Sequence, residues 1–300
     1  MINRKIVISA LATSVMLVAT HAYADRNIQE SLPLSKSGRI VVNNTIGSIT
    51  VRGQAEASGP ARQVELVGTI EDRVTKVEFT TSDEITEIDV KIPERGDDRG
   101  AELTITVPAD VNLNISSVSA EILVENVSGK LKMNSVSGDI VASCDSDEIN
   151  FQTFSGEVTI SAVAAEIEGN AISGDIQITG ADKMANVKTV SGDASISGVT
   201  FEYVMLDSVS GDLNFTGNLA PSIRCEGHTI SGDLIFNINS DVSAEFTFES
   251  LSGDLETEFN VDTRHEKRFG PGKNLEFNLG GGSGRVQLET LSGDVELNKR

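Results

Sequence analysis

The sequence predicts an all-β protein, a parallel β-solenoid of about 18–21 residues per coil with two strands per coil and an irregular β-rich N-terminal cap. Three observations lead to this prediction. The triplet Ser-Gly-Asp recurs at nearly constant spacing, and apolar and polar residues alternate between the triplets. No stretch after residue 24 keeps an apolar period of 3.6 residues, so helices should be nearly absent.

The repeat has a long and a short period. The triplet serines stand at positions 137, 155, 173, 191, 210, 231, 252 and 292, with spacings of 18, 18, 18, 19, 21, 21 and 40, the last close to two units. The second copy ends in Glu157, and the other seven end in Asp. A repeat of about 20 residues is typical of solenoids. A spacing of 9 is also visible, in Ser119, Ser128, Ser137 and Ser146. Each unit of 18 therefore consists of two halves, one with the glycine corner and one without it.

Each half should hold one strand and one corner. Val136, Ile140 and Ala142 alternate with polar residues, and runs after Ile172 and Ile230 do the same, which predicts strands with these residues on one buried face. Glycine allows positive φ at the corner. The predicted corner glycines are Gly138, Gly156, Gly174, Gly192, Gly211, Gly232, Gly253 and Gly293. An antiparallel sandwich is the alternative fold, but it does not require the same corner at the same phase.

The chain divides into four segments. Arg4 and Lys5, the apolar run 6–19 and the small-x-small residues 22–24 predict a signal peptide over 1–24. An uncleaved anchor is the alternative, although this apolar run is shorter than the roughly 20 residues that span a bilayer. A linker over 25–37, the cap over 38–110 and the solenoid over 111–300 follow. The solenoid should have nine or ten coils and a length of roughly 45 Å.

Export through the signal peptide places the mature chain in the periplasm or at the cell surface, with no transmembrane segment. The formal net charge of −21 argues against nucleic acid and anionic membranes as partners. The cap should cover the strand edges at one end of the solenoid. At the other end, Glu296, Lys299 and Arg300 are expected to protect the last strand, with end-to-end self-association as the alternative.

The triplet is interpreted as structural, so no catalytic residue and no cofactor are expected. A nucleophilic serine needs a base, and after residue 24 only His228 and His265 are present for eight triplets. A polysaccharide-processing parallel β-helix is the enzymatic alternative. It would require clustered basic and acidic residues on one face.

Stacked corners would place their carboxylates about 4.8 Å apart, where neighbours repel by roughly 0.9 kcal/mol in water. The row must turn into solvent, bond to corner N–H groups or attract cations. Weak Ca²⁺ binding is the cation hypothesis, and a cation-stabilised β-roll is the corresponding functional alternative, although one carboxylate per corner makes six ligands hard to assemble. The row comprises Asp139, Glu157, Asp175, Asp193, Asp212, Asp233, Asp254 and Asp294.

Two further features lie outside the triplets. Arg264, His265, Lys267 and Arg268 form a basic cluster, interpreted as a solvated loop or as a contact for an acidic partner. Cys144 and Cys225 fall at different phases of the coil, about four coils apart, which is too far for a disulfide. Two unpaired thiols are expected.

The stretch AELTITVPADVNLNISSVSAEILVENVSGKLKMNSVSGDIVAS resembles the putative-adhesin, domain-of-unknown-function family of bacterial envelope proteins with β-strand repeats. The resemblance covers about residues 38–300 and departs from the pattern between Leu255 and Leu291. It implies an exported β-solenoid with an adhesin-like role and no established catalytic site. The partner would be an envelope or surface protein or a polysaccharide, of unknown identity.

Overall fold

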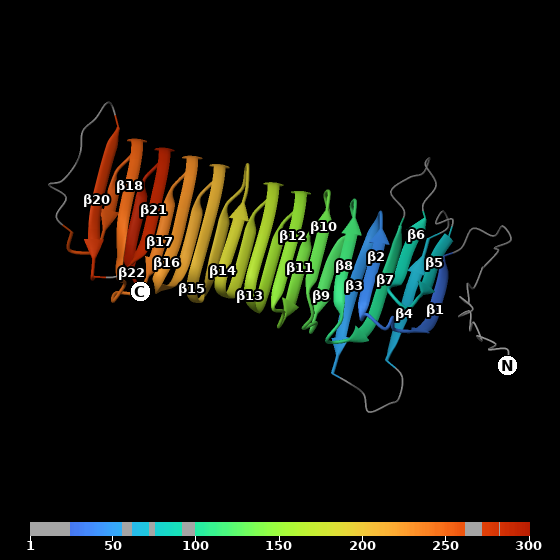
Figure 1. Cartoon of the computed structure of the whole chain (residues 1–300). Coiled ribbons are helices and arrows are strands. Elements are labelled where there is room, and N and C mark those ends of the chain that lie inside the picture. Colours follow the sequence, from blue (N-terminus) through green and yellow to red (C-terminus); the bar gives the residue numbers. More distant parts are fainter. Residues whose placement is uncertain (1–24, 56–61, 72–75, 92–99, 262–271, 282) are drawn as a thin grey trace, which may run out of the picture.

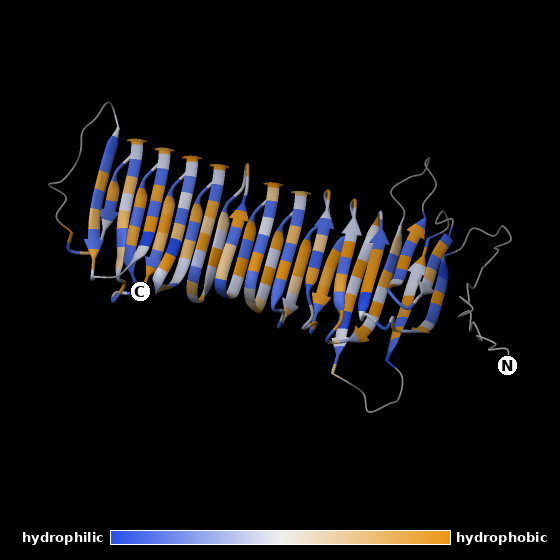
Figure 2. Ribbon diagram, viewed as in Figure 1, coloured by the Kyte–Doolittle hydropathy of each residue, from blue (hydrophilic) through white to orange (hydrophobic). Residues whose placement is uncertain are grey.

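The computed structural model describes residues 25–55, 62–71, 76–91, 100–261, 272–281 and 283–300, and these form one 22-stranded sheet without a helix. The all-β class is thereby confirmed. The strands lie side by side along a rod (Figure 1). Alternating hydrophobic and hydrophilic bands run along the strands, as expected for one buried and one solvated face (Figure 2).

The parallel strands fall into two rows that face each other across the core. The chain leaves a first-row strand, turns at a Ser-Gly-Asp corner and continues in the second row, and we call this pair a coil. Strands β13 to β16 each combine a second-row strand with the first-row strand that follows it. They are β13 (Val158–Ser173), β14 (Ile176–Lys188), β15 (Ala194–Ser210) and β16 (Leu213–Ser231).

The remaining strands complete the two rows. The first row also contains β5 (Lys76–Thr81), β6 (Thr86–Lys91), β2 (Arg39–Asn44), β8 (Asn112–Ser117), β10 (Leu131–Ser135), β12 (Glu148–Ser155), β21 (Gly284–Ser292), β18 (Ala244–Ser252) and β20 (Lys273–Leu279). The second row also contains β1 (Arg26–Pro33), β4 (Gln63–Ile70), β7 (Ala101–Pro108), β3 (Gly47–Gln54), β9 (Glu121–Glu125), β11 (Ile140–Cys144), β17 (Leu234–Ile238), β22 (Val295–Lys299) and β19 (Leu255–Thr257).

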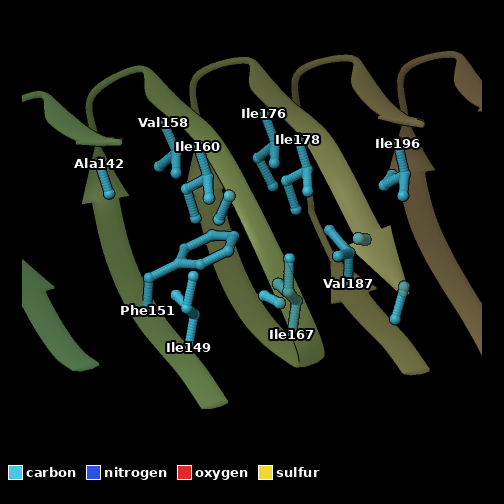
Figure 3. Packing of buried hydrophobic residues seen from close by; sticks show 14 of the residues in the cluster. Ala142, Ile149, Phe151, Val158, Ile160, Ile167, Ile176, Ile178, Val187 and Ile196 are labelled. Carbon is cyan, nitrogen blue, oxygen red and sulfur yellow. The ribbon is translucent and has the colours of Figure 1, made fainter. Parts of the chain in front are cut away.

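Equivalent residues of adjacent coils pair in register. Ile140 pairs with Val158, and Val158 pairs with Ile176, one repeat period further along the chain each time. Equivalent residues of successive coils are therefore aligned along the rod. In the core, Ile149 and Phe151 of one row face Val158 and Ile160 of the other (Figure 3). The ring of Phe151 occupies the space over Gly169 in the next coil, where a Cβ atom would lie 2.0 Å from the ring.

The coils do not follow chain order at the C-terminal end. β21 pairs with both β16 and β18, and β22 pairs with both β17 and β19. The last coil in the chain, β21 with β22, therefore lies between the coil of β16 and β17 and the coil of β18 and β19 (Figure 1). The expectation that Glu296, Lys299 and Arg300 protect an edge strand is therefore wrong. β20 pairs antiparallel with β18 beyond this inserted coil.

The N-terminal end shows the same kind of insertion. β2 and β3 lie between the coil of β8 and β9 and the coil of β6 and β7 (Figure 1). At this end both rows finish with antiparallel strands. In the first row β5 pairs with β6, and in the second row β4 pairs with β7 and β1 pairs with β4. Residues 26–33, which fall within the predicted linker over 25–37, form β1. Their partner strand β4 follows only after β2 and β3 in the chain, so local patterning does not reveal the pairing.

Candidate functional site

The repeated corner is the candidate site because it presents the same side chains at the same place in successive coils. In one coil, Thr189 is buried, Val190 and Ser191 both point outward, and Ala194 is buried again at the start of the next strand. Two consecutive outward residues interrupt the alternation of the strands. Three parallel columns result along this edge of the rod, one apolar, one of serines and one of carboxylates.

The corner glycines lie in one column and allow close stacking. A Cβ atom added at any of the eight predicted glycines would lie 1.9–2.6 Å from a backbone oxygen of the adjacent coil. At Gly174 and Gly192 the φ angles of 120° and 131° also disfavour side chains. The glycine is thus required by the neighbouring coil as well as by the local turn.

The carboxylates of the triplets hydrogen-bond from coil to coil. Asp193 Oδ1 accepts the backbone N–H of Asp212 at 2.8 Å, and Asp212 Oδ1 accepts that of Asp233 at 2.8 Å. The same bond joins Asp139 to Glu157, Asp175 to Asp193, Asp233 to Asp294 and Asp294 to Asp254. Bonding to corner N–H groups, one of the three arrangements expected for the row, is therefore present. We call these residues the carboxylate column.

The residue before each of the eight triplet serines, together with Val118 before Ser119, forms what we call the apolar column. Its side chains are 43–57 % exposed in nine successive coils. Val136, Ile172 and Ile230 belong to it, so their predicted place on the buried face is wrong. The physical reason is the corner itself, because two consecutive outward residues shift the alternation. In order along the rod the column comprises Val118, Val136, Phe154, Ile172, Val190, Val209, Ile230, Leu291 and Leu251.

A groove of about 580 Å³ borders the apolar column near the C-terminal end of the rod. His228 lies at its edge, with Nδ1 3.0 Å from Oδ1 of Asp207 and Nε2 3.9 Å from Oε2 of Glu289. Lys188 lies 2.9 Å from Asp207, whose hydrogen bond and charge raise the pKa of the lysine. The groove is also lined by Ile230, Glu249, Leu251, Lys273, Asn274 and Leu291.

His228, a possible base for a triplet serine, contacts carboxylates instead. Both ring nitrogens of His228 face carboxylates, and no hydrogen bond found among the described residues joins it to a triplet serine. His265 and the basic cluster Arg264, Lys267 and Arg268 lie outside the described residues, as does the signal peptide. Their roles remain predictions.

Two negative findings concern metal ions and membranes, and both apply to the part of the chain that the structure describes. There, no group of three or more His, Cys, Asp or Glu side chains is arranged to hold a metal ion. No helix of sufficient length and apolarity to cross a bilayer is found in the same residues. Calcium binding by the carboxylate column remains an untested hypothesis.

Both cysteines are unpaired and buried, as predicted from the coil phase. Burial, with a smaller contribution from the charge of Asp145, raises the pKa of Cys144 to about 11. Burial also raises the pKa of Cys225, assisted by the charge of Glu226. Neither thiol has the lowered pKa of a nucleophilic cysteine.

Comparison with known proteins identifies the family. The Toastrack DUF4097 description matches residues 54–298. The chain belongs to the Toastrack DUF4097 family. The resemblance to the domain-of-unknown-function family with β-strand repeats is therefore confirmed, and the matched range includes every corner described above. No curated protein matches the chain.

Several solved structures are similar to this Toastrack chain. A putative adhesin from Bacteroides fragilis NCTC 9343 is 13 % identical, with a TM-score of 0.44, over 93 % of this chain and 99 % of the other. A putative adhesin from Parabacteroides distasonis ATCC 8503 is 12 % identical, with a TM-score of 0.41, over 91 % and 97 %. A putative lipid binding protein from the same strain is 9 % identical, with a TM-score of 0.39, over 91 % and 96 %.

Proposed function

We propose that this protein is a non-catalytic, exported β-solenoid that serves as an adhesin-like or scaffolding element of the bacterial cell envelope. In this proposal the coils, two strands each with the period of the triplet repeat, form the shaft, and the strands before residue 111 cap it. The observation that carries the proposal is the continuity of the three corner columns. They offer a long repetitive face, which suits interaction with an extended partner.

The hydrogen bonds of the carboxylate column support a stiff shaft. Each such bond ties a side chain of one coil to the backbone of the next, in addition to the strand pairing. Stiffness holds the corners in line, so a partner can contact many coils at once. Multiple weak contacts of this kind add to a large effective affinity.

Export is the second part of the proposal, and residues 1–24 support it through their signal-peptide pattern. Fractionation of cells carrying the full chain with a C-terminal tag tests it. The tagged protein should be found in the periplasm or at the surface, with its N-terminus at or near Asp25. Cytosolic protein with an intact N-terminus would contradict the proposal.

Retention by isolated envelopes tests the interaction role. Purified protein should sediment with envelope fragments, and a version lacking residues 262–272 shows whether the basic cluster contributes. Incubation with acidic polysaccharides should release no reducing ends. Release of reducing ends would favour the polysaccharide-processing alternative instead.

A further inference from the structure

The apolar column is an exposed hydrophobic surface that strand formation does not explain. Nine half-exposed aliphatic or aromatic side chains follow one another along one edge, one per coil. At a coil spacing of about 4.8 Å they extend over roughly 38 Å. Scattered surface apolar residues are ordinary, whereas a contiguous exposed apolar surface marks a site of interaction.

The carboxylate column runs beside the apolar column on the same corner. In each coil the acidic residue follows the apolar residue by three positions, as in Val190 and Asp193. One oxygen of Asp193 accepts the N–H of Asp212. For its second oxygen no bond is found among the described residues. On the other flank, Glu249 and Glu289 line the groove.

The apolar and carboxylate columns would be matched by a partner that carries one line of apolar side chains and a neighbouring line of positively charged side chains. An α-helix completes a turn every 5.4 Å, close to the coil spacing of about 4.8 Å, whereas a strand places side chains of one face roughly 6.7 Å apart. A helix lying along the rod can thus set about one apolar residue against each coil. A second copy of this chain would bring its own carboxylates, and its net charge of −21, against the same surface.

We propose that the apolar and carboxylate columns together bind a cationic amphipathic helix, with its apolar stripe on the apolar column and its Lys or Arg side chains against the carboxylates. This rests on the proposed function and names the chemical class of the partner. A helix of about 25 residues spans the column. The helix axis lies parallel to the rod.

The probe is a 25-residue Leu/Lys peptide with leucines on one helical face. Its dissociation constant for the full-length exported protein is measured by fluorescence anisotropy. Two further peptides serve as controls, one with every Lys replaced by Glu and one with the same composition in scrambled order. The amphipathic Leu/Lys peptide should bind most tightly. Binding should weaken at 1 M salt, where the screening length falls to about 3 Å.

Two triple variants test the two columns separately. Ile172→Ser, Val190→Ser and Val209→Ser remove apolar surface, and Asp175→Asn, Asp193→Asn and Asp212→Asn remove charge while keeping the Oδ1 acceptor. Each triple should weaken binding at least tenfold. Should the serine triple fail to fold, the near-isosteric Val136→Thr, Val190→Thr and Val209→Thr triple replaces it.

Matched controls replace exposed apolar and acidic residues that lie away from the Ser-Gly-Asp corner. Val67→Ser, Val163→Ser and Val199→Ser alter exposed apolar residues elsewhere, and Glu65→Gln, Glu102→Gln and Glu202→Gln remove three exposed charges. Both control triples should change the dissociation constant less than twofold. Equal losses in control and column variants would overturn the proposal, as would equal binding of the scrambled peptide.

The outcomes separate this inference from the proposed function. If no peptide binds while isolated envelopes still retain the protein, the cationic-helix partner is overturned and the envelope role stands. If the amphipathic peptide binds as described but the protein is found in the cytosol, the helix site stands and the envelope role fails.

Discussion

Asp193 and Asp212 are 19 residues apart, yet Oδ1 of Asp193 accepts the backbone N–H of Asp212 at 2.8 Å. The acidic residue of each corner thus acts on the next coil as well as on its own turn. A carboxylate in this position can satisfy a backbone donor that would otherwise face solvent at the corner. The repetition of the triplet therefore reflects a contact between coils.

Removing this acceptor should destabilise the rod. Asp193→Ala is expected to lower the free energy of unfolding by about 1 kcal/mol, the usual contribution of one hydrogen bond. Asp193→Asn keeps the acceptor and relieves repulsion with Asp175 and Asp212, so it should be at least as stable as the wild type. Urea unfolding at low salt measures both. Equal destabilisation by the two substitutions would show that hydrogen-bond acceptance is not the role of the side chain.

A side chain at a corner glycine should be poorly tolerated. In Gly174→Ala the new Cβ would lie 2.3 Å from the carbonyl oxygen of Gly156, at a φ of 120°. We expect a loss of roughly 2–4 kcal/mol in unfolding free energy, from the clash and the strained backbone together. Gly281→Ala is the matched control, because no atom lies within 4 Å of its Cβ position. Similar melting temperatures for the two variants would contradict this account.

Two phenylalanines of one strand should respond differently to truncation. Phe151 of β12 is fully buried, whereas Phe154 of the same strand is 57 % exposed in the apolar column. Phe151→Ala should cost about 3–5 kcal/mol in unfolding free energy, and Phe154→Ala less than about 1 kcal/mol. Denaturant unfolding of both variants measures the difference. A large loss of unfolding free energy in Phe154→Ala would show instead that this side chain packs in the core.

The buried thiols should react slowly in the folded protein. Because the thiolate is the reactive form and the pKa of Cys144 is about 11, only about one molecule in a thousand carries the thiolate at pH 8. Alkylation of Cys144 should therefore accelerate nearly tenfold per pH unit between pH 8 and 10, measured by mass spectrometry. Cys225, more deeply buried, should react later. In urea without reductant both thiols should react, and failure of both to react would indicate a disulfide.

Calcium should have little effect on stability. One oxygen of most acidic residues in the carboxylate column already accepts a backbone N–H, and Ca²⁺ takes six or more oxygen ligands. We expect the melting temperature to be the same in chelator and in millimolar Ca²⁺. A rise that saturates with Ca²⁺ and is not reproduced by equal ionic strength would instead favour the cation hypothesis.

The corner could be predicted because it depends on local pattern. A triplet repeated at nearly constant spacing indicates which residues share a corner, and the glycines accordingly lie in one column. The apolar column carried a sequence signal as well, namely an apolar residue directly before every triplet serine. Strand alternation continued through the corner predicts a buried position for this residue. At the corner, however, Val136 and Ser137 both point outward.

The ends of the rod could not be predicted in the same way. Ser231 and Ser292 lie far apart in the chain yet pair in adjacent coils, and Ser252 pairs on the other side of Ser292. Any coil of this regular type offers the same strand edges to any other. The order of the coils at the two ends is therefore set by long-range pairing, and no local pattern encodes it.

The sequence by itself determined the strand period, the corner chemistry and the acidic character of this protein, because each is a property of residues close together in the chain. Only the tertiary structure decided which coils are neighbours, which apolar side chains face solvent and that the corner carboxylates bond across coils. These depend on contacts between residues 18 to 61 positions apart, whose geometry exists only once the coils have stacked.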